Sequence, residues 1–114
     1  MSMKLTTRDV SGGSIVDLSG KITLGEGGVA LREEVRKLLA EGKKKIVLNL
    51  AEVNYIDSSG LGELVSSYTA VKNAGGELKL LNLTSKVRDL LVITKLVTVF
   101  DVKDDEASAV GSFA

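Results

Sequence analysis

A nearly continuous apolar run, Ile46-Val47-Leu48-Asn49-Leu50, is the feature that most constrains the fold of this chain. A strand that is apolar on both faces must be covered on both faces, as a central strand of a parallel sheet is. Apolar residues recur at helical spacing before and after the run, in residues 29–41 and 59–73. The order of helix, buried strand and helix predicts an α/β fold in which helices pack on a sheet with parallel crossovers.

The other elements predicted from the pattern complete a mixed sheet. Residues 3–10 and 14–19 are expected to be strands, and Gly12-Gly13 between them predicts a hairpin turn. Residues 20–28 and 51–54 are expected to be loops, the first of them rich in glycine. Two further strands are expected at 78–83 and 96–100, and the helix between them is expected to be capped by Thr84 or Ser85.

The length of 114 residues suits one domain with one modest core. We expect that core to span about residues 3–103, and residues 104–114 to form a terminal helix or a frayed tail. No apolar stretch approaches the roughly 18 residues that a membrane-spanning helix needs, and the pattern of a signal peptide is missing. The expected location is therefore the cytoplasm, without direct insertion into a membrane.

Composition excludes several classes of chemistry. The chain has no cysteine and no histidine, which excludes disulfides, thiolate zinc sites and hydrolases that pair serine with histidine. Its formal net charge of zero gives no positive field for nucleic acid. The basic run Lys43-Lys44-Lys45 is either a phosphate or membrane contact or, as we expect, a solvated helix end. We therefore expect no enzyme, no cofactor, no metal and no nucleic-acid partner.

The run Asp57-Ser58-Ser59-Gly60-Leu61-Gly62 opens the second predicted helix. It follows a buried strand, so it should lie at the solvent-facing edge where α/β sheets gather ligands and partners. A phosphoryl group on Ser58 would add about −1.5 to −2 charges at a helix N-terminus, where free N–H groups favour anions. The alternative is a purely structural role, because aspartate, serine and glycine are also the ordinary residues of a helix cap.

Two weaker patterns suggest other ligands. Gly25-Glu26-Gly27-Gly28-Val29-Ala30 resembles a glycine-rich dinucleotide loop, with Glu52 a little over twenty residues further on. We expect a loop beside the docking edge instead, because the chain is too short for a full dinucleotide fold. The acidic residues Asp101, Asp104, Asp105 and Glu106 are expected to be a solvated terminal segment rather than a metal site. Tyr55 and Tyr68 are expected to be packing residues rather than binding platforms.

The sequence resembles the STAS family, specifically the stand-alone bacterial anti-sigma factor antagonists. The resemblance covers nearly the whole chain, and Asn49 stands where many relatives carry aspartate. The segments that carry it are Leu18-Ser19-Gly20-Lys21-Ile22-Thr23, Ile46-Val47-Leu48-Asn49-Leu50, Ile56-Asp57-Ser58-Ser59-Gly60-Leu61-Gly62, Gly75-Gly76-Glu77-Leu78 and Leu91-Val92-Ile93-Thr94-Lys95-Leu96 before Val99-Phe100. The resemblance implies a single STAS-like α/β domain, with a mixed β-sheet, an N-terminal hairpin and helices packed mainly on one face.

The resemblance also implies a function. The unphosphorylated protein would bind an anti-sigma factor, which is a histidine-kinase-like ATPase acting on serine, and would thereby free a sigma factor. Phosphorylation at Ser58 would break the complex, and a PP2C-type phosphatase would restore it. In this comparison Asp57 positions or polarises Ser58, Gly60 allows the kinase to approach, and Ser59 is the helix cap. The other docking residues would be Leu61 and Gly62.

Two alternatives to this function stay open. The same surface would bind constitutively if the chain were a STAS subunit of a lipid-transport ATPase complex or of a stressosome-like scaffold. An enzyme or a nucleotide-binding protein is the third possibility, which the missing histidine and cysteine disfavour. The oligomeric state, and the choice between Ser58 and Ser59 as the acceptor, do not follow from the residues alone.

Overall fold

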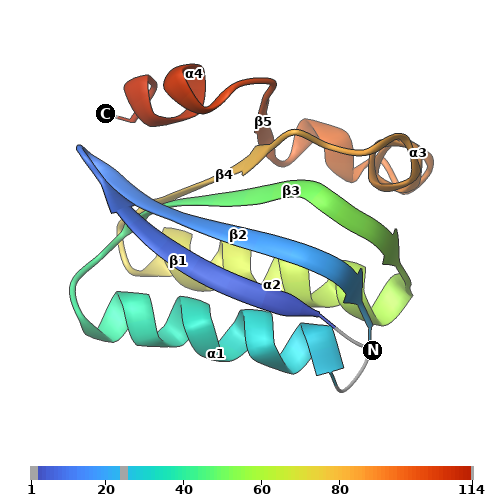
Figure 1. Ribbon diagram of the computed structural model, residues 1–114, viewed down its shortest axis with the longest axis horizontal. Coiled ribbons are helices and arrows are strands. Elements are labelled where there is room, and N and C mark those ends of the chain that lie inside the picture. The colour runs from blue at the N-terminus through green and yellow to red at the C-terminus, as the bar shows by residue number, and fades with distance from the viewer. Residues whose placement is uncertain (1–2, 24–25, 114) are drawn as a thin grey trace.

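The computed structural model describes residues 3–23 and 26–113. Within these residues one five-stranded sheet runs in the order β1-β2-β3-β4-β5 (Figure 1). β1 (Lys4–Val10) is antiparallel to β2 (Gly13–Ile22). β2, β3 (Lys45–Ile56), β4 (Glu77–Leu81) and β5 (Asp101–Lys103) are parallel to one another. The predicted mixed sheet with an N-terminal hairpin is thus confirmed.

The helices cover both faces of this sheet unequally. The two long helices, α1 (Glu26–Ala40) and α2 (Ser58–Asn73), lie side by side on one face (Figure 1). α3 (Ser85–Ile93) follows β4 and packs against β3, and a short 3-10 helix, η1 (Leu96–Thr98), leads into β5. α4 (Glu106–Gly111) lies on the face opposite α1 and α2 (Figure 1). The main helical layer therefore lies on one face, as expected.

The apolar run in β3 divides its side chains between the two faces. Ile46, Leu48 and Leu50 belong to the main core, which β2, β3 and β4 form with α1 and α2. Val47 points the other way and packs with Ile15, Leu81 and Ala109 of α4 in a second, smaller cluster. Both faces of β3 are therefore covered by apolar side chains. For this reason its sequence lacks the alternation of apolar and polar residues that is typical of a half-exposed strand.

Two predicted loops are shorter in the structure than in the sequence pattern. β3 does not end near Leu50 but continues through residues 51–54, because β2 extends to Ile22 and pairs with it up to Ile56. The predicted loop 20–28 shrinks for the same reason, and α1 already begins at Glu26. Gly20 adopts φ of 106° where the register between β2 and β3 shifts, a backbone conformation that favours glycine.

The strand predicted at residues 96–100 is wrong. Leu96–Thr98 forms η1, and the last strand lies at Asp101–Lys103. Lys95 precedes η1 with φ of 65°, which turns the chain out of α3, and the N–H of Val99 then donates to the carbonyl of Leu96. The β-branched residues in this run suggested a strand, but local turn hydrogen bonds and the packing of Leu96 and Val97 against the core decide the conformation.

The start of α2 is fixed against the end of β2 by a close backbone contact. Gly60 is buried, and a Cβ atom at this position would overlap the carbonyl oxygen of Ile22 and touch the side chain of Ile56. The N–H of Asp57 donates to the same carbonyl of Ile22, at 3.4 Å. Gly62, one half-turn further along α2, is exposed and has open space where a Cβ would lie.

These two glycines give a matched test of the contact. Gly60→Ala should lower the free energy of unfolding by about 3 kcal/mol, because the added methyl group forces the helix away from β2. Gly62→Ala should raise it by about 1 kcal/mol, since alanine is the better helix former and meets nothing. Urea denaturation followed by circular dichroism measures both. Equal effects in the two variants would contradict the contact with Ile22.

A polar network joins three strands and α4 on the face opposite α1. Arg8 donates from Nε to Oδ2 of Asp17 at 2.6 Å and also pairs with Glu106 of α4. Asn49 donates from Nδ2 to Oδ1 of Asp17 at 2.8 Å and accepts from the N–H of Ala51. The hydrogen bond from Arg8 holds the pKa of Asp17 below its ordinary value, while partial burial opposes this shift. Asn49 is thus hydrogen-bonded both to the neighbouring strand and to its own backbone.

This network should make the free energy of unfolding depend on pH in the acidic range. Because the pKa of Asp17 is lowered in the folded state, its contribution is present above the pKa of the unfolded chain, about 3.9, and is lost as the pH falls below that value. Urea titrations between about pH 6 and pH 2 should show a shallower loss of stability for Asp17→Asn than for the wild type. If the free energy of unfolding fell in parallel with pH for the two proteins, the ion pair would contribute nothing to stability.

Candidate functional site

Ser58 lies where β3 passes into α2, at the carboxyl end of the parallel strands β2 and β3 (Figure 1). β3 ends at Ile56, Asp57 is the N-cap, and Ser58 is the first residue of α2. The side chain of Ser58 is exposed, whereas Ser59 is partly buried. The structure thus places Ser58 on the sheet edge where partners and ligands of α/β proteins bind.

The cap of α2 is Asp57 rather than Ser59, the residue expected from the sequence. Oδ1 of Asp57 accepts from the backbone N–H of Gly60 at 2.7 Å, and the carbonyl of Asp57 accepts from the N–H of Leu61 at 2.8 Å. The described residues show no hydrogen bond between Asp57 and the hydroxyl of Ser58. Asp57 therefore fixes the position of Ser58 through the helix start and does not polarise its hydroxyl directly.

The Ser58 hydroxyl is left out of this capping. It has no hydrogen-bond partner among the described residues, and neither do the backbone N–H groups of Ser58 and Ser59. Free N–H groups in the first turn carry the positive end of the helix dipole, which favours a negative group. Chemically, this arrangement offers an accessible hydroxyl at a position that tolerates an added anion.

The remaining residues of the motif divide between core and surface. Gly60 and Leu61 are buried, so neither is available to a docked protein. The absence of a side chain at Gly60 lets the backbone of β2 approach, so this glycine has a structural role. Gly62 is exposed on the same turn as Ser58. Within the motif, Ser58 and Gly62 are exposed, while Asp57 and Ser59 are only partly accessible.

A shallow hollow of about 310 Å³ lies beside the helix start. Its lining residues are Tyr55, Ile56, Lys86, Asp89, Leu90 and Ile93. Tyr55 is 44% exposed and Ile93 is 76% exposed, and the Nζ of Lys21 lies 6.0 Å from the centre of the Tyr55 ring. Tyr55 is thus half exposed at the sheet edge, whereas the ring of Tyr68 packs edge-to-face on Phe100 at 5.4 Å.

Sequence reasoning missed this hollow because it forms between β3 and α3. One signal was available: the buried stripe of α3 is Val87 and Leu91, and Ile93 lies off that stripe. An apolar residue on the polar side of a helix is a candidate for contact with a partner protein. The exposure of Tyr55 could not be predicted, because it follows from the continuation of β3 through a segment that was expected to be a loop.

The other patterns seen in the sequence have structural explanations. A Cβ at Gly27 would overlap the carbonyl oxygen of Lys21, so this glycine packs against β2; Gly25 of the same motif lies outside the described residues. In the acidic segment, Asp105 caps α4, and the other carboxylates pair with basic side chains: Asp101 with Lys79, Asp104 with Arg88 and Glu106 with Arg8. Residues 3–23 and 26–113 contain no group of three or more ligands placed to hold a metal ion.

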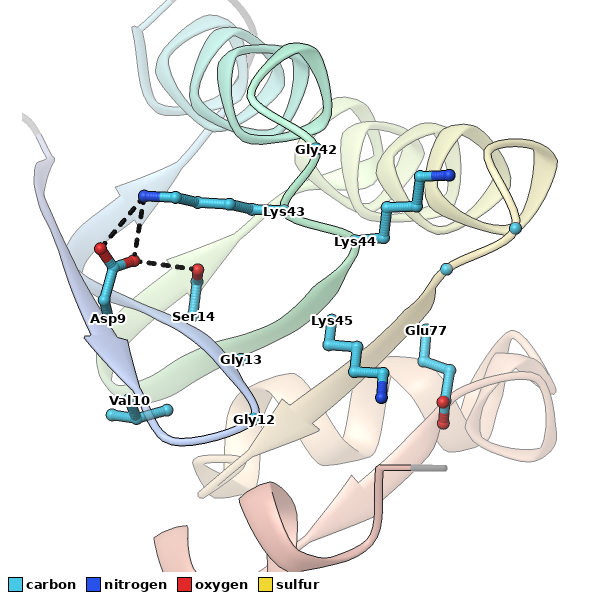
Figure 2. A pocket seen from close by; sticks show the side chains of 12 residues that line it. Asp9, Val10, Gly12, Gly13, Ser14, Gly42, Lys43, Lys44, Lys45 and Glu77 are labelled. Carbon is cyan, nitrogen blue, oxygen red and sulfur yellow. Dashed lines mark hydrogen bonds and ion pairs between the residues drawn. The ribbon is translucent and has the colours of Figure 1, made fainter.

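A larger hollow, of about 500 Å³, lies at the opposite end of the sheet (Figure 2). The turns before β2, β3 and β4 form it, including the run Lys43-Lys44-Lys45. Nζ of Lys43 pairs with Asp9 at 3.1 Å and with Glu41 at 3.6 Å, which raises the pKa of Lys43 through the hydrogen bond to Asp9. Lys44 also lines the hollow, and its side chain extends toward the end of α2 (Figure 2). These placements fit a solvated helix end rather than an anion site.

Known proteins resemble this chain over most of its length. The STAS domain model matches residues 4–109. The anti-sigma-B factor antagonist of Bacillus subtilis strain 168 is 37% identical over 87 residues, which cover 76% of this chain and 78% of the relative. No helix in the described residues is long and apolar enough to cross a membrane.

Solved structures share the fold. An anti-sigma factor antagonist from Mycobacterium paratuberculosis has a TM-score of 0.86 at 22% identity and covers 98% of this chain and 94% of its own. The Bacillus cell fate determinant SpoIIAA in its phosphorylated form has a TM-score of 0.71 at 17% identity, covering 92% of this chain and 96% of its own. Since the family match runs from β1 into α4, the chain belongs to the STAS domain family.

Proposed function

We propose that this chain is an anti-sigma factor antagonist that is switched by phosphorylation of Ser58. The unphosphorylated form binds an anti-sigma factor and frees a sigma factor, and the phosphate on Ser58 releases the complex. The observation that carries the proposal is the exposed Ser58 hydroxyl at the first residue of α2, which the capping of the helix does not use. The similarity to the anti-sigma-B factor antagonist supports this role.

The proposal extends to the partners of the chain. The anti-sigma factor is a histidine-kinase-like ATPase that phosphorylates Ser58, and a PP2C-type phosphatase removes the phosphate in the cytoplasm. The chain itself acts by binding and not as an enzyme. That SpoIIAA has been solved in a phosphorylated form supports the idea that a STAS fold keeps its shape when it carries phosphate.

The geometry explains how a phosphate would act on binding rather than on folding. The cap hydrogen bond runs from the Gly60 N–H to Asp57, so the modification breaks no contact of the folded state. The free N–H groups of the first turn favour the new charge, while neighbouring Asp57 opposes it. A docked partner that places carboxylates at this edge would meet about two additional negative charges and be repelled.

Substitution of Ser58 separates binding from stability. Ser58→Asp should weaken binding to the anti-sigma factor by about tenfold or more through charge repulsion, which corresponds to about 1.4 kcal/mol. It should leave the free energy of unfolding within about 0.5 kcal/mol of the wild type, because the side chain is exposed. Ser58→Ala should bind like the wild type and accept no phosphate. Isothermal titration calorimetry and urea denaturation measure the two effects.

Ser59→Ala is the matched control, because Ser59 neighbours Ser58 but is partly buried. This variant should still be phosphorylated, as mass spectrometry of the protein from its native cells would record. Phosphate on Ser59 alone would move the acceptor by one residue. Strong binding by Ser58→Asp, or no phosphate under any growth condition, would contradict the switch and favour a constitutive subunit of a transport or scaffold complex.

A further inference from the structure

We propose that the hollow beside Ser58 is the docking pocket for an apolar side chain of the anti-sigma factor, and that Lys21 and Lys86 bind carboxylates next to that side chain. The hollow is lined by Tyr55, Leu90 and Ile93, among others. This inference rests on the proposed function and adds to it the partner chemistry and the reason why phosphate disrupts the complex.

The apolar part of the pocket is exposed to an extent that folding does not require. The side chain of Ile93 is 76% exposed and Tyr55 is 44% exposed. Both line the hollow together with Leu90, so the exposed apolar side chains are gathered around one hollow rather than scattered over the surface. Hollows bordered by aromatic and aliphatic side chains are the places where a partner inserts an anchoring residue.

The rim of the hollow carries basic charge. Lys86 lines it, and Lys21 lies over the ring of Tyr55. Within the described residues neither lysine forms an ion pair, in contrast to Arg8, Lys43 and Lys79 elsewhere in the chain. Asp89 is the acidic residue among those that line the hollow, and it also has no ion-pair partner in the described part of the chain. Two cations and one anion favour a partner that brings carboxylates.

The chemistry of this rim argues against a second copy as the occupant. In a symmetric pair the same patch would face itself, which brings Lys21 and Lys86 toward the same lysines of the other copy. A partner with a leucine, methionine or phenylalanine flanked by aspartate or glutamate satisfies both the hollow and its rim. We therefore assign the anti-sigma factor, and not a homodimer, to this surface.

The position of the pocket connects docking with the switch. Tyr55 and Ile56 line the hollow and are followed directly by Asp57 and Ser58, so both features belong to one continuous stretch of chain. Carboxylates held by Lys21 and Lys86 would therefore lie beside the phosphate on Ser58. Phosphorylation then repels the same groups that the lysines attract, which gives the switch a specific target on the partner.

The experiment measures binding kinetics by surface plasmon resonance. The probes are the purified histidine-kinase-like ATPase domains encoded in the source genome, tested against the unphosphorylated wild type and its variants. Ile93→Ser should raise the dissociation rate about tenfold or more, because an anchor contact is lost. Val99→Ser is the matched control, since Val99 is 42% exposed but lines a different hollow, and it should leave both rates unchanged.

Charge variants test the rim separately. Lys86→Glu should lower the association rate about tenfold at low salt, and Asp89→Asn should raise it several-fold, because rim charges act mainly on the encounter of the two proteins. Both differences should shrink as salt is added. A purely structural role of Lys86 or Asp89 would not produce opposite changes in the association rate.

The outcomes distinguish this inference from the proposed function. If Ser58→Asp abolishes binding while Ile93→Ser and the charge variants bind like the wild type, the switch stands and the pocket assignment is wrong. If no ATPase domain binds the wild-type protein, the proposed function fails and the inference fails with it. A homodimer in solution that Ile93→Ser dissociates would overturn the assignment in favour of a second copy.

Discussion

The contact between the backbone of Gly60 and the carbonyl of Ile22 is the constraint on which the site depends. It brings the first turn of α2 so close to the end of β2 that only glycine fits between them. The same carbonyl also accepts the N–H of Asp57, so strand, cap and helix meet at one atom. With α2 anchored in this way, Ser58 projects from a rigid junction rather than from a mobile loop, which gives a modifying enzyme or a partner a fixed geometry to recognise.

The sequence predicted the features that depend on local chemistry. Periodicity and turn residues predicted the hairpin, the central strand, α1, α2 and α3, and the structure agrees. Of the two cap candidates for α3, Thr84 and Ser85, the structure has Thr84 as the cap. The helix start at Ser58 followed in the same way from aspartate, serine and glycine in series. Features that depend on distant parts of the chain could not be predicted. The extension of β3 through residues 51–54 requires knowing how far β2 runs, and the strand expected at 96–100 fails because of its turn after Lys95.

The candidate site also combines features that the sequence could predict with features that it could not. The position of Ser58, the proposed acceptor, at a helix start could be predicted because a helix start is a local feature, but the roles of its neighbours could not. Gly60 is conspicuous in the sequence, yet its role is set by a strand almost forty residues earlier. Tyr55 and Ile93 come from β3 and α3, and only the packing of α3 on the sheet brings them to one hollow. Surface recognition is a property of the assembled fold, and single-residue patterns carry little of it.

The cap formed by Asp57 has a consequence for how long a signal would persist in the cell. Since the hydrogen bond to the Gly60 N–H does not involve the Ser58 hydroxyl, the two forms of the proposed switch should unfold equally rarely and be degraded by proteases at equal rates. The cellular ratio of the two forms would then record only the competing activities of the kinase and the phosphatase. Protein turnover would dilute both forms alike, so the information would decay with growth and not with selective destruction of one form.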